Sequence, residues 1–500
     1  MKISKHLVFV LLIMLSAMLF SSCGGVGRGY SMPRLAKDSP LAQARSIINP
    51  DSEVRGVWIA SVFNIDYPSR TDLDAASLKG EIDDVLNTCE KYGLNTVFFQ
   101  VRPACDALYK SDIFPVSSFL NSGGELLFDP LEYIVREGHR RNIFVHAWIN
   151  PLRVTVSKDS EEKLPDNSPA KLHPEWTVKY ADGKVYLNAG LPEVTELVKS
   201  GVSEIVSKYD VDGVVFDDYF YPYPVDGAQF DDGEAYKKHG AEFDNVADWR
   251  RNNINSMIKA SYDAVKGGDP DCLFGVSPCG VWQNNNGSNG GSDTRGFEGY
   301  TSLYCDALAW IEGGYIDYIS PQIYWQTSSA ATPYDTLSDW WNAALDGSGV
   351  DLIISHAAYR YEDGDWEEPS GEMTRQIEYS RSALAYRGSM FYGYDEVSGN
   401  VRGVSAELDG LYTNEIVYCD PSPDDRGVTF DGIENGGSAP AGELTVSGHS
   451  DPALPLLADG LKLSRGKDGS FTVKLTVNKG SNSYEFKQGE KTYTLELKGE

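Results

Sequence analysis

From residue 54 to residue 412, short runs rich in Val, Ile, Phe and Tyr alternate with longer stretches whose apolar residues recur every three or four positions. Runs of the first kind predict buried β-strands, and stretches of the second kind predict amphipathic helices. The regular alternation of the two is typical of parallel βα units, in which each strand is followed by a helix that covers the sheet.

Eight such units can be counted along this part of the chain. The expected strands are 54–62, 96–101, 143–149, 213–217, 273–277, 318–324, 352–356 and 389–394. The expected helices are 75–92, 130–141, 193–208, 246–266, 302–312, 337–345, 371–387 and 405–412. Eight units predict an α/β fold, a (β/α)8 TIM barrel, with an open doubly wound sheet as the alternative. The long connections after strands two to five would all lie on the catalytic face.

The N-terminal end has the pattern of an export signal. Residues 1–22 combine a basic start with an apolar run, and the small residues before Cys23 resemble a bacterial lipoprotein cleavage site. We expect a signal peptide at 1–22, a lipid on Cys23 and a tether at 23–52, with an ordinary secretory signal as the alternative. The expected location is the cell envelope, anchored to the outer membrane by the lipid. Because no acidic run follows Cys23, the periplasmic side is favoured.

The C-terminal end differs from the central part. We assign 53–415 to the barrel and 416–442, which is rich in Pro, Gly and Ser, to a linker. Residues 443–500 alternate polar and apolar positions with short Gly-containing turns, which predicts a small β module. A module of this size is expected to pack on the barrel, because it is too small for a large core of its own.

Charge and cysteine content restrict the classes of partner. The formal net charge of -29 becomes -31 when residues 1–22 are removed, because they contain two lysines and no acid. Such a surface repels phosphate backbones, so nucleic acid is not an expected partner. It also disfavours a polyanionic substrate, unless a local basic pocket compensates. The cysteines show no metal-ligand spacing, and neither do His146 and His356, so no metal or other cofactor is expected.

The strongest candidate for chemistry follows the fourth expected strand. The apolar run 214–216 leads directly into Asp217 and Asp218, and four aromatic residues follow before residue 224. In parallel barrels the carboxyl ends of the strands carry the site. Carboxylates act as acids and bases on glycosidic bonds, and aromatic rings stack on sugars. This segment therefore predicts carbohydrate chemistry.

Polar and aromatic side chains also follow the other strands, more than a rim with a purely structural role would need. We predict that eleven of these residues bind substrate: Asp66, Arg102, His146, Trp148, Asn150, Asn188, Tyr219, Gln322, Tyr324, Trp325 and His356.

The identity of a second catalytic carboxyl is less direct. Glycosidases use two carboxyl groups, and consecutive strand residues point to opposite faces. Asp217 and Asp218 can therefore form the pair only if the strand ends before them. The other candidates follow strands one, two and eight: Asp66, Asp106 and Glu396. We predict Asp217, Asp218 and Asp106 as catalytic. Arg102 would keep Asp106 ionised, although a purely structural ion pair is the alternative.

Several of these segments resemble glycosyl-hydrolase-like family 10 of bacterial exported proteins. The motifs are V-R-G-V-W (54–58), N-I-D-Y-P (64–68), F-Q-V-R-P-A-C-D-A-L-Y (99–109), H-A-W-I-N-P-L-R (146–153), D-G-V-V-F-D-D-Y-F-Y-P (212–222) and S-P-Q-I-Y-W (320–325). The resemblance covers the barrel and not the C-terminal module. It implies glycosidic substrates, and some members of the family are linked to cleavage of peptidoglycan glycan strands.

The segment 212–217 also resembles the fourth strand of α-amylase-type barrels, which would make Asp217 a nucleophile. Val215 stands where that pattern has Arg, however, and no Glu follows the fifth strand. The Asp-Gly start is similar to chitinase-type barrels too. Tyr219 stands where those enzymes have their acidic Glu, so an N-acetyl-assisted mechanism lacks its usual donor.

We therefore predict a glycoside hydrolase that acts on a polysaccharide, with peptidoglycan glycan strands as one candidate substrate, by carboxylate acid–base catalysis. One alternative is a non-catalytic glycan-binding lipoprotein on the same scaffold, and another is a metal-dependent deacetylase. The expected partners are the glycan and, through the N-terminal lipid, a membrane; the sequence does not indicate an oligomeric state.

Overall fold

The computed structural model describes residues 53–364, 366, 369–412, 427–451, 454–466, 469–489 and 491–500. The signal peptide, Cys23 and the tether, all expected before residue 53, lie outside the described residues. Within the described ranges, no helix combines the length and the apolar character that crossing a bilayer requires.

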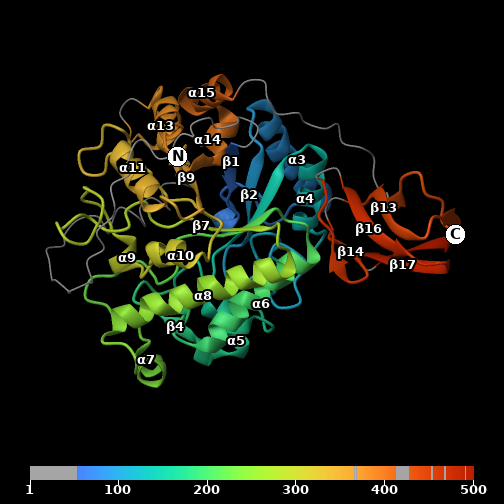
Figure 1. Ribbon diagram of the computed structural model, residues 1–500. Helices are drawn as coiled ribbons and strands as arrows, with labels where there is room; N and C mark the ends of the chain where they lie inside the picture. The colour runs from blue at the N-terminus through green and yellow to red at the C-terminus, as the bar shows by residue number, and fades with distance from the viewer. Residues whose placement is uncertain are drawn as a thin grey trace.

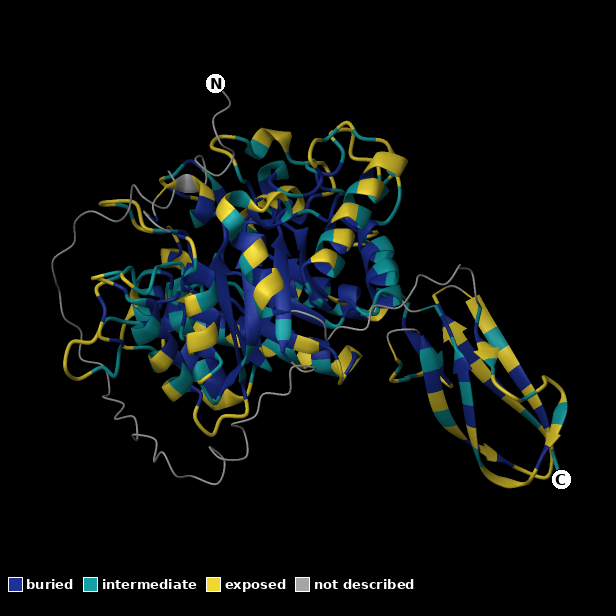
Figure 2. Ribbon diagram, turned by 90° about the horizontal axis from the view of Figure 1, so that it is seen from above, coloured by how far each residue is buried: buried dark blue, intermediate teal, exposed yellow. Residues whose placement is uncertain are grey.

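Eight parallel strands close into a barrel in the order β1-β10-β9-β8-β7-β6-β3-β2, which confirms the predicted fold and excludes an open sheet. They are β1 (Val54–Ile59), β2 (Thr96–Arg102), β3 (Phe144–Ile149), β6 (Gly213–Phe216), β7 (Leu273–Val276), β8 (Tyr318–Ile319), β9 (Asp351–Ala357) and β10 (Tyr386–Tyr392). Figure 2 shows the buried strands at the centre, surrounded by helices whose exposed faces point outward.

The helices that cover the barrel follow the strands as the periodicity predicted (Figure 1). They are α3 (Ala75–Lys91), α4 (Pro130–Arg140), α6 (Pro192–Lys208), α8 (Val246–Gly268), α10 (Ala307–Gly313), α11 (Tyr334–Ala344), α13 (Glu372–Ser380) and α15 (Val404–Leu411). Helix α4 shows why one of them begins where it does. The Asp129 carboxylate accepts the N–H of Glu132, and Pro130 occupies the first turn, where no N–H donor is needed.

The connections contain shorter elements. The helices are α5 (Pro169–Leu172), α7 (Gly233–His239), α9 (Gly299–Ser302), α12 (Arg360–Asp363) and α14 (Tyr394–Gly399). The 3-10 turns are η2 (Val62–Asn64), η3 (Glu161–Lys163), η4 (Pro174–Trp176) and η5 (Val401–Gly403). Strands β4 (Thr177–Lys179) and β5 (Val185–Leu187) pair as a hairpin in the long connection after β3.

Several predicted boundaries were wrong, among them those of the sixth strand and of the seventh helix. The sixth strand was expected over 318–324, but β8 ends at Ile319 because the chain leaves the ladder at Pro321, which has no N–H to donate. Gln322 then makes only isolated bridges to its neighbours. The helix expected to reach residue 387 ends at Ser380, and β10 begins at Tyr386. Gly388 in β10 lies so close to β1 that a Cβ there would be 2.0 Å from the carbonyl oxygen of Val54.

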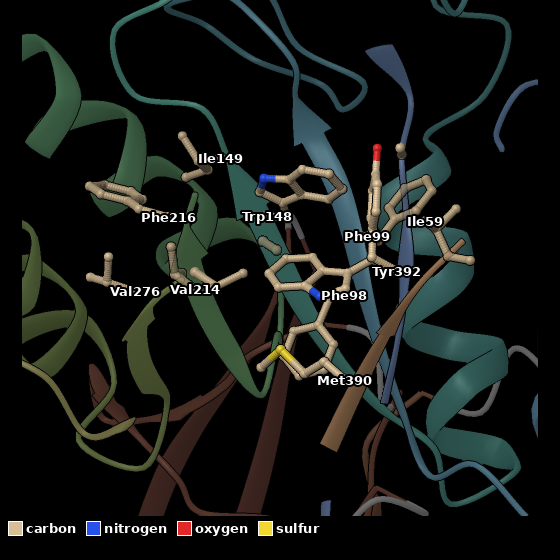
Figure 3. Close-up of a cluster of buried hydrophobic side chains, with 14 of the residues drawn as sticks. Ile59, Phe98, Phe99, Trp148, Ile149, Val214, Phe216, Val276, Met390 and Tyr392 are labelled. Atoms are coloured by element: carbon tan, nitrogen blue, oxygen red, sulfur yellow. The ribbon is translucent and has the colours of Figure 1, made fainter. Parts of the chain in front are cut away.

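The amino-terminal half of the barrel lumen is filled by rings that lie against glycines. A Cβ on Gly56 would lie 2.3 Å from Phe98, and one on Gly275 would lie 2.2 Å from Tyr318. Small and large residues therefore alternate between neighbouring strands, so that a glycine on one strand makes room for a ring from the next. Figure 3 shows buried side chains of the barrel strands, with Trp148 and Tyr392 closer to the carboxyl ends of the strands than Phe98 and Met390.

The predicted C-terminal β module is confirmed, but it begins earlier than expected. Its strands are β11 (Thr429–Phe430), β12 (Gly437–Ala439), β13 (Gly442–His449), β14 (Leu456–Ala458), β15 (Leu461–Lys462), β16 (Ser470–Val477), β17 (Gly480–Gln488) and β18 (Lys491–Gly499). β11, β13 and β16 form one sheet and the other five strands form a second sheet. The stretch 429–439 therefore belongs to the module and not to the linker. It lacks the β-branched alternation that marks a strand, and β12 is held by its pairing with β18.

The module packs on the amino-terminal face of the barrel, as its small size led us to expect. Arg465 forms an ion pair with Asp210, and the Lys462 ammonium lies 3.4 Å from the same carboxylate. Asp210 precedes β6, so it lies at the end of the barrel where the strands begin. Arg136 of α4 lies 3.3 Å from Asp451 and extends this contact (Figure 1). The opposite, carboxyl-terminal face is left to the candidate site.

Candidate active site

The two aspartates after β6 lie together in one pocket. β6 ends at Phe216, whose carbonyl accepts the N–H of Ser277 at 2.7 Å, so Asp217 and Asp218 lie just beyond the ladder. The alternation of strand side chains therefore no longer separates them. Both carboxyl groups line the same pocket at this end of the barrel. The condition under which the sequence allowed this pair is thus met.

Asp217 is held by donors from β3 and from its own loop. Trp148 donates its indole N–H at 3.0 Å, and the Asn150 amide nitrogen lies 3.1 Å from each carboxylate oxygen. The N–H of Tyr219 donates to the same carboxyl at 3.3 Å. Burial is the largest influence and raises the pKa of Asp217 to about 7; the charge of Asp218 adds to the rise, while Arg153 and the donors oppose it.

Asp218 turns toward a different set of partners. The Tyr223 hydroxyl donates to one carboxylate oxygen, and the Gln322 amide donates to the other at 3.0 Å. Gln322 is fixed in turn by a second bond, 3.1 Å to the carbonyl of Ser277. Burial also raises the pKa of Asp218, and the hydrogen bonds from Tyr223 and Gln322 counteract it. The two acids thus enter from one strand end and turn toward opposite neighbours.

Arg153 is the cation that lines this pocket. Its guanidinium lies 4.7 Å from the centre of the Tyr219 ring, and its Nε donates to the carbonyl of Pro103 at 3.0 Å. The backbone N–H of Arg153 donates to the Asn150 side-chain oxygen at 3.0 Å, which orients the amide that holds Asp217. The positive charge lowers the pKa of both aspartates against the effect of burial.

Aromatic rings form much of the remaining wall. The Trp58 indole packs edge-on against Trp148 at 4.8 Å and donates its N–H to the Ser355 hydroxyl at 3.0 Å. Tyr324 and Tyr392 stack with their ring centres 6.1 Å apart. Trp58 was not predicted as a site residue. The available signal was its place two positions after Gly56, which puts both residues on the lumen face of β1.

The structure gathers about half of the predicted site residues in the pocket. The predicted residues that line it are Trp148, Asp217, Asp218, Tyr219, Gln322 and Tyr324. Asn150 is next to it through its bonds to Asp217. The other lining residues are Trp58, Val62, Gln100, Arg153, Tyr223, Ser277, Tyr359 and Tyr392.

Arg102 and Asp106 are not among the lining residues. The Arg102 guanidinium is fully buried 3.6 Å from the Phe114 ring, and a Cβ on Gly201 of α6 would lie 2.5 Å from it. It therefore lies between the barrel and α6. Asp106 accepts the N–H of Ala104 at 3.2 Å. We expected Arg102 to keep Asp106 ionised, but burial outweighs that charge and raises the pKa of Asp106.

The two predicted histidines are also away from the pocket lining. His356 faces outward from β9, where Gln376 contacts Nδ1 at 2.9 Å and Ser389 contacts Nε2 at 2.8 Å. Burial lowers the pKa of His356 to about 4, so the ring is neutral at neutral pH. His146 lies deeper in the lumen, with Nδ1 2.9 Å from the Tyr318 hydroxyl. Across the described ranges, no three His, Cys, Asp or Glu residues are grouped so that they could hold a metal ion.

The remaining predicted residues serve local structure. Asp66 accepts the N–H of Ala60 at 2.7 Å, and the Asn188 side chain accepts the N–H of Gly190 at 3.0 Å. Trp325 accepts a hydrogen bond from Gln376 through its backbone carbonyl and is not part of the lining. Glu396, the candidate after the eighth strand, is buried in α14, where burial raises its pKa to about 8. It does not line the pocket either.

A closed (β/α)8 barrel whose strand ends bring paired carboxyls and stacked rings into one pocket defines a protein of the glycoside hydrolase-like barrel class. The chain belongs to the glycosyl hydrolase-like 10 family, whose model matches residues 53–369.

Two relatives support this assignment. Glycosyl hydrolase YngK of Bacillus subtilis (strain 168) is 39% identical over 375 residues, which are 74% of this chain and 72% of YngK. Glycosyl hydrolase DigH of Escherichia coli (strain K12) is 35% identical over 403 residues, 76% of this chain and 91% of DigH. Among solved structures, the catalytic domain of β-amylase from Paenibacillus polymyxa is 10% identical at a TM-score of 0.46, over 73% of this chain and 99% of that one. So distant a likeness says nothing about chemistry.

Proposed function

We propose that this protein is a glycoside hydrolase that cleaves glycosidic bonds of a polysaccharide, with Asp217 and Asp218 at the reaction centre. The observation that carries the proposal is that both carboxyls line one ring-walled pocket at the carboxyl ends of the barrel strands. Membership in a glycosyl hydrolase-like family and relatives named glycosyl hydrolases support it.

The surroundings of the two acids suggest which one transfers a proton and which one stays ionised. The pKa of Asp217, about 7, leaves a large protonated fraction at neutral pH, which suits a general acid that protonates the leaving oxygen. Asp218 accepts hydrogen bonds from Tyr223 and Gln322, which favour its ionised form. In this assignment Asp217 exchanges the proton and Asp218 carries the negative charge that faces the sugar.

For the substrate, we propose peptidoglycan glycan strands as the first candidate. The aromatic wall around Trp58, Trp148 and Tyr324 offers ring surfaces on which sugars stack. The proposed location agrees with this substrate, because a lipid on Cys23 would hold the chain in the envelope where such strands lie. The membrane is then a partner through that lipid alone.

The test compares three single variants on purified glycan strands and on chitin, mannan and glucan oligosaccharides. Asp217→Asn and Asp218→Asn should each fold and lose hydrolysis by about 10³-fold. Asp226→Asn is the matched control, since Asp226 is exposed in the same loop and should keep full activity. If no glycan is cleaved while both variants bind glycan as tightly as the unmodified protein, the chain is a glycan-binding barrel instead.

A further inference from the structure

The two carboxyls of the pocket are neighbours in the chain, and this restricts where they can stand around a sugar. Their Cα atoms are about 3.8 Å apart, as in any trans peptide, and both side chains enter the pocket from the end of β6. Asp217 turns toward Trp148 and Asn150, while Asp218 turns toward Tyr223 and Gln322. Both acids therefore belong to one wall.

The rest of the described lining contains no acid. Tyr324, Tyr359 and Tyr392 come from or follow strands β8, β9 and β10, and Trp58 comes from β1. Gln100 uses its side-chain oxygen to accept the N–H groups of Ser61 and Val62, each at 2.9 Å. None of these groups is a carboxylate, so none can serve as the nucleophile or the base of the two-carboxylate mechanisms.

Hydrolysis of a glycoside needs more than an acid on one wall. In the two-carboxylate mechanisms, a nucleophile or a base that activates water must act on the face of the sugar opposite to the leaving group. Where the protein supplies no such group, a 2-acetamido group on the sugar can take the role, as in substrate-assisted glycosidases.

We propose that the nucleophile in this pocket is the 2-acetamido group of the substrate sugar itself. The proposal rests on the function proposed above and specifies how the glycosidic bond is attacked. It also revises our expectation that an N-acetyl-assisted route lacks a donor because Tyr219 replaces Glu. Since β6 ends one residue before Asp217, the adjacent aspartates supply both required carboxyls, and Tyr219 is left to stack on Arg153.

The reaction proceeds in two displacements at C1. The acetamido carbonyl oxygen attacks C1 and forms a new C1–O bond, while the bond to the leaving sugar breaks and its oxygen takes the proton of Asp217. The N–H of the resulting oxazolinium ring donates to the Asp218 carboxylate. Water then attacks C1 and returns a proton to Asp217, and the ring C1–O bond breaks to restore the acetamido group. Two inversions at C1 give a product with retained configuration.

The pocket offers the surroundings that this reaction needs. Trp148, Trp58 and Val62 provide an apolar surface beside the acids against which the acetamido methyl group can pack. Asp218 uses one bond on each oxygen, to Tyr223 and Gln322, and a carboxylate oxygen can accept a second.

The first experiment measures rates on aryl glycosides of N-acetylglucosamine oligosaccharides and on analogues that carry N-trifluoroacetyl or 2-hydroxyl groups. The rate should fall by about tenfold or more with the trifluoroacetyl group, because fluorine withdraws electrons from the attacking oxygen. The 2-hydroxyl analogue should not be cleaved. The anomer released first, followed by NMR, should have the configuration of the substrate.

The second experiment measures binding and does not depend on turnover. The thiazoline analogue of N-acetylglucosamine imitates the cyclic intermediate and should bind about 10²-fold more tightly than N-acetylglucosamine itself. Asp218→Asn should lose most of that gain, whereas Asp226→Asn should retain it.

The outcomes distinguish the acetamido nucleophile from the glycoside hydrolase function on which it rests. Inverted product, a sugar trapped covalently on the protein, equal rates on 2-hydroxyl substrates or no preference for the thiazoline would each overturn the acetamido nucleophile, although hydrolysis itself would stand. No hydrolysis of any glycan, together with no thiazoline binding, would overturn both.

Discussion

The two halves of the barrel lumen are built from the same strands, but their buried polar side chains have different surroundings. In the amino-terminal half, glycines admit rings from neighbouring strands, and the one histidine there, His146, contacts the Tyr318 hydroxyl. In the carboxyl-terminal half, Asp217 and Asp218 are just as deeply buried but face open space. A buried polar side chain alone therefore does not indicate a binding or catalytic site. A buried polar side chain that also lines an open pocket does.

The largest effect should come from the open half. Asp217→Asn or Asp218→Asn should reduce hydrolysis by about 10³-fold while the protein still folds, because the side-chain shape is kept and the amide nitrogen that faces a donor costs only about 1–3 kcal/mol. Rates and urea unfolding curves measured on the same samples check this. Loss of activity through unfolding would mean that the two halves do not differ in this respect.

Substitutions in the amino-terminal half of the lumen, which rings fill, should change the stability of the fold. Gly275→Ala would place a Cβ 2.2 Å from the Tyr318 ring and should destabilise the fold by about 1–3 kcal/mol. Gly267→Ala is the matched control, since a Cβ there meets nothing within 4 Å and Ala favours the helix by about 0.5–1 kcal/mol. Urea denaturation measures both. Equal effects of the two substitutions on stability would show that the amino-terminal half of the lumen is not tightly packed.

The pH dependence of hydrolysis should identify the acid in the carboxyl-terminal half of the lumen. With Asp217 as the acid, kcat/KM should fall as pH rises through about 7. Because Arg153 lowers the pKa of both aspartates, Arg153→Met should move this decline to higher pH, and Arg153→Lys should move it less. A decline that stays in place in Arg153→Met would contradict the assignment.

The same titration affects stability with a definite sign. The pKa of Asp217 is raised in the folded state, so its contribution favours folding at pH values below the unfolded pKa and is lost as pH rises through about 7. Asp217→Asn should flatten this part of the stability profile, as measured by thermal unfolding from pH 4 to 8.

The smallest effect is expected at the aromatic wall. Trp58→Phe removes the N–H that donates to Ser355 and part of the ring surface, while most of the packing against Trp148 is kept. We expect a KM increase of about threefold to tenfold with kcat nearly unchanged. A fall in kcat alone would mean that Trp58 acts on the bond-breaking step.

The barrel could be predicted because alternating periods of two and 3.6 mark every βα unit, whatever the loops contain. The boundaries of individual strands and helices could not be predicted in this way. Whether Asp217 and Asp218 share a pocket depends on the strand ending at residue 216 and not at residue 217, as we had expected. Arg102 was expected just after a strand, as Arg153 was, but it is the last residue of β2, where a register shift after Gln100 accompanies its burial under α6. Only Arg153 lines the pocket. Sequence spacing carries no trace of that shift.

The place where the C-terminal module is attached has a practical consequence. Arg465 and Lys462 hold it at the end of the barrel from which the strands start, so nothing in this contact covers the mouth of the pocket. A surface, a bead or a second protein coupled through the module would leave a long polymer free to lie across the opening, which makes this the better side for immobilising the protein in a glycan assay.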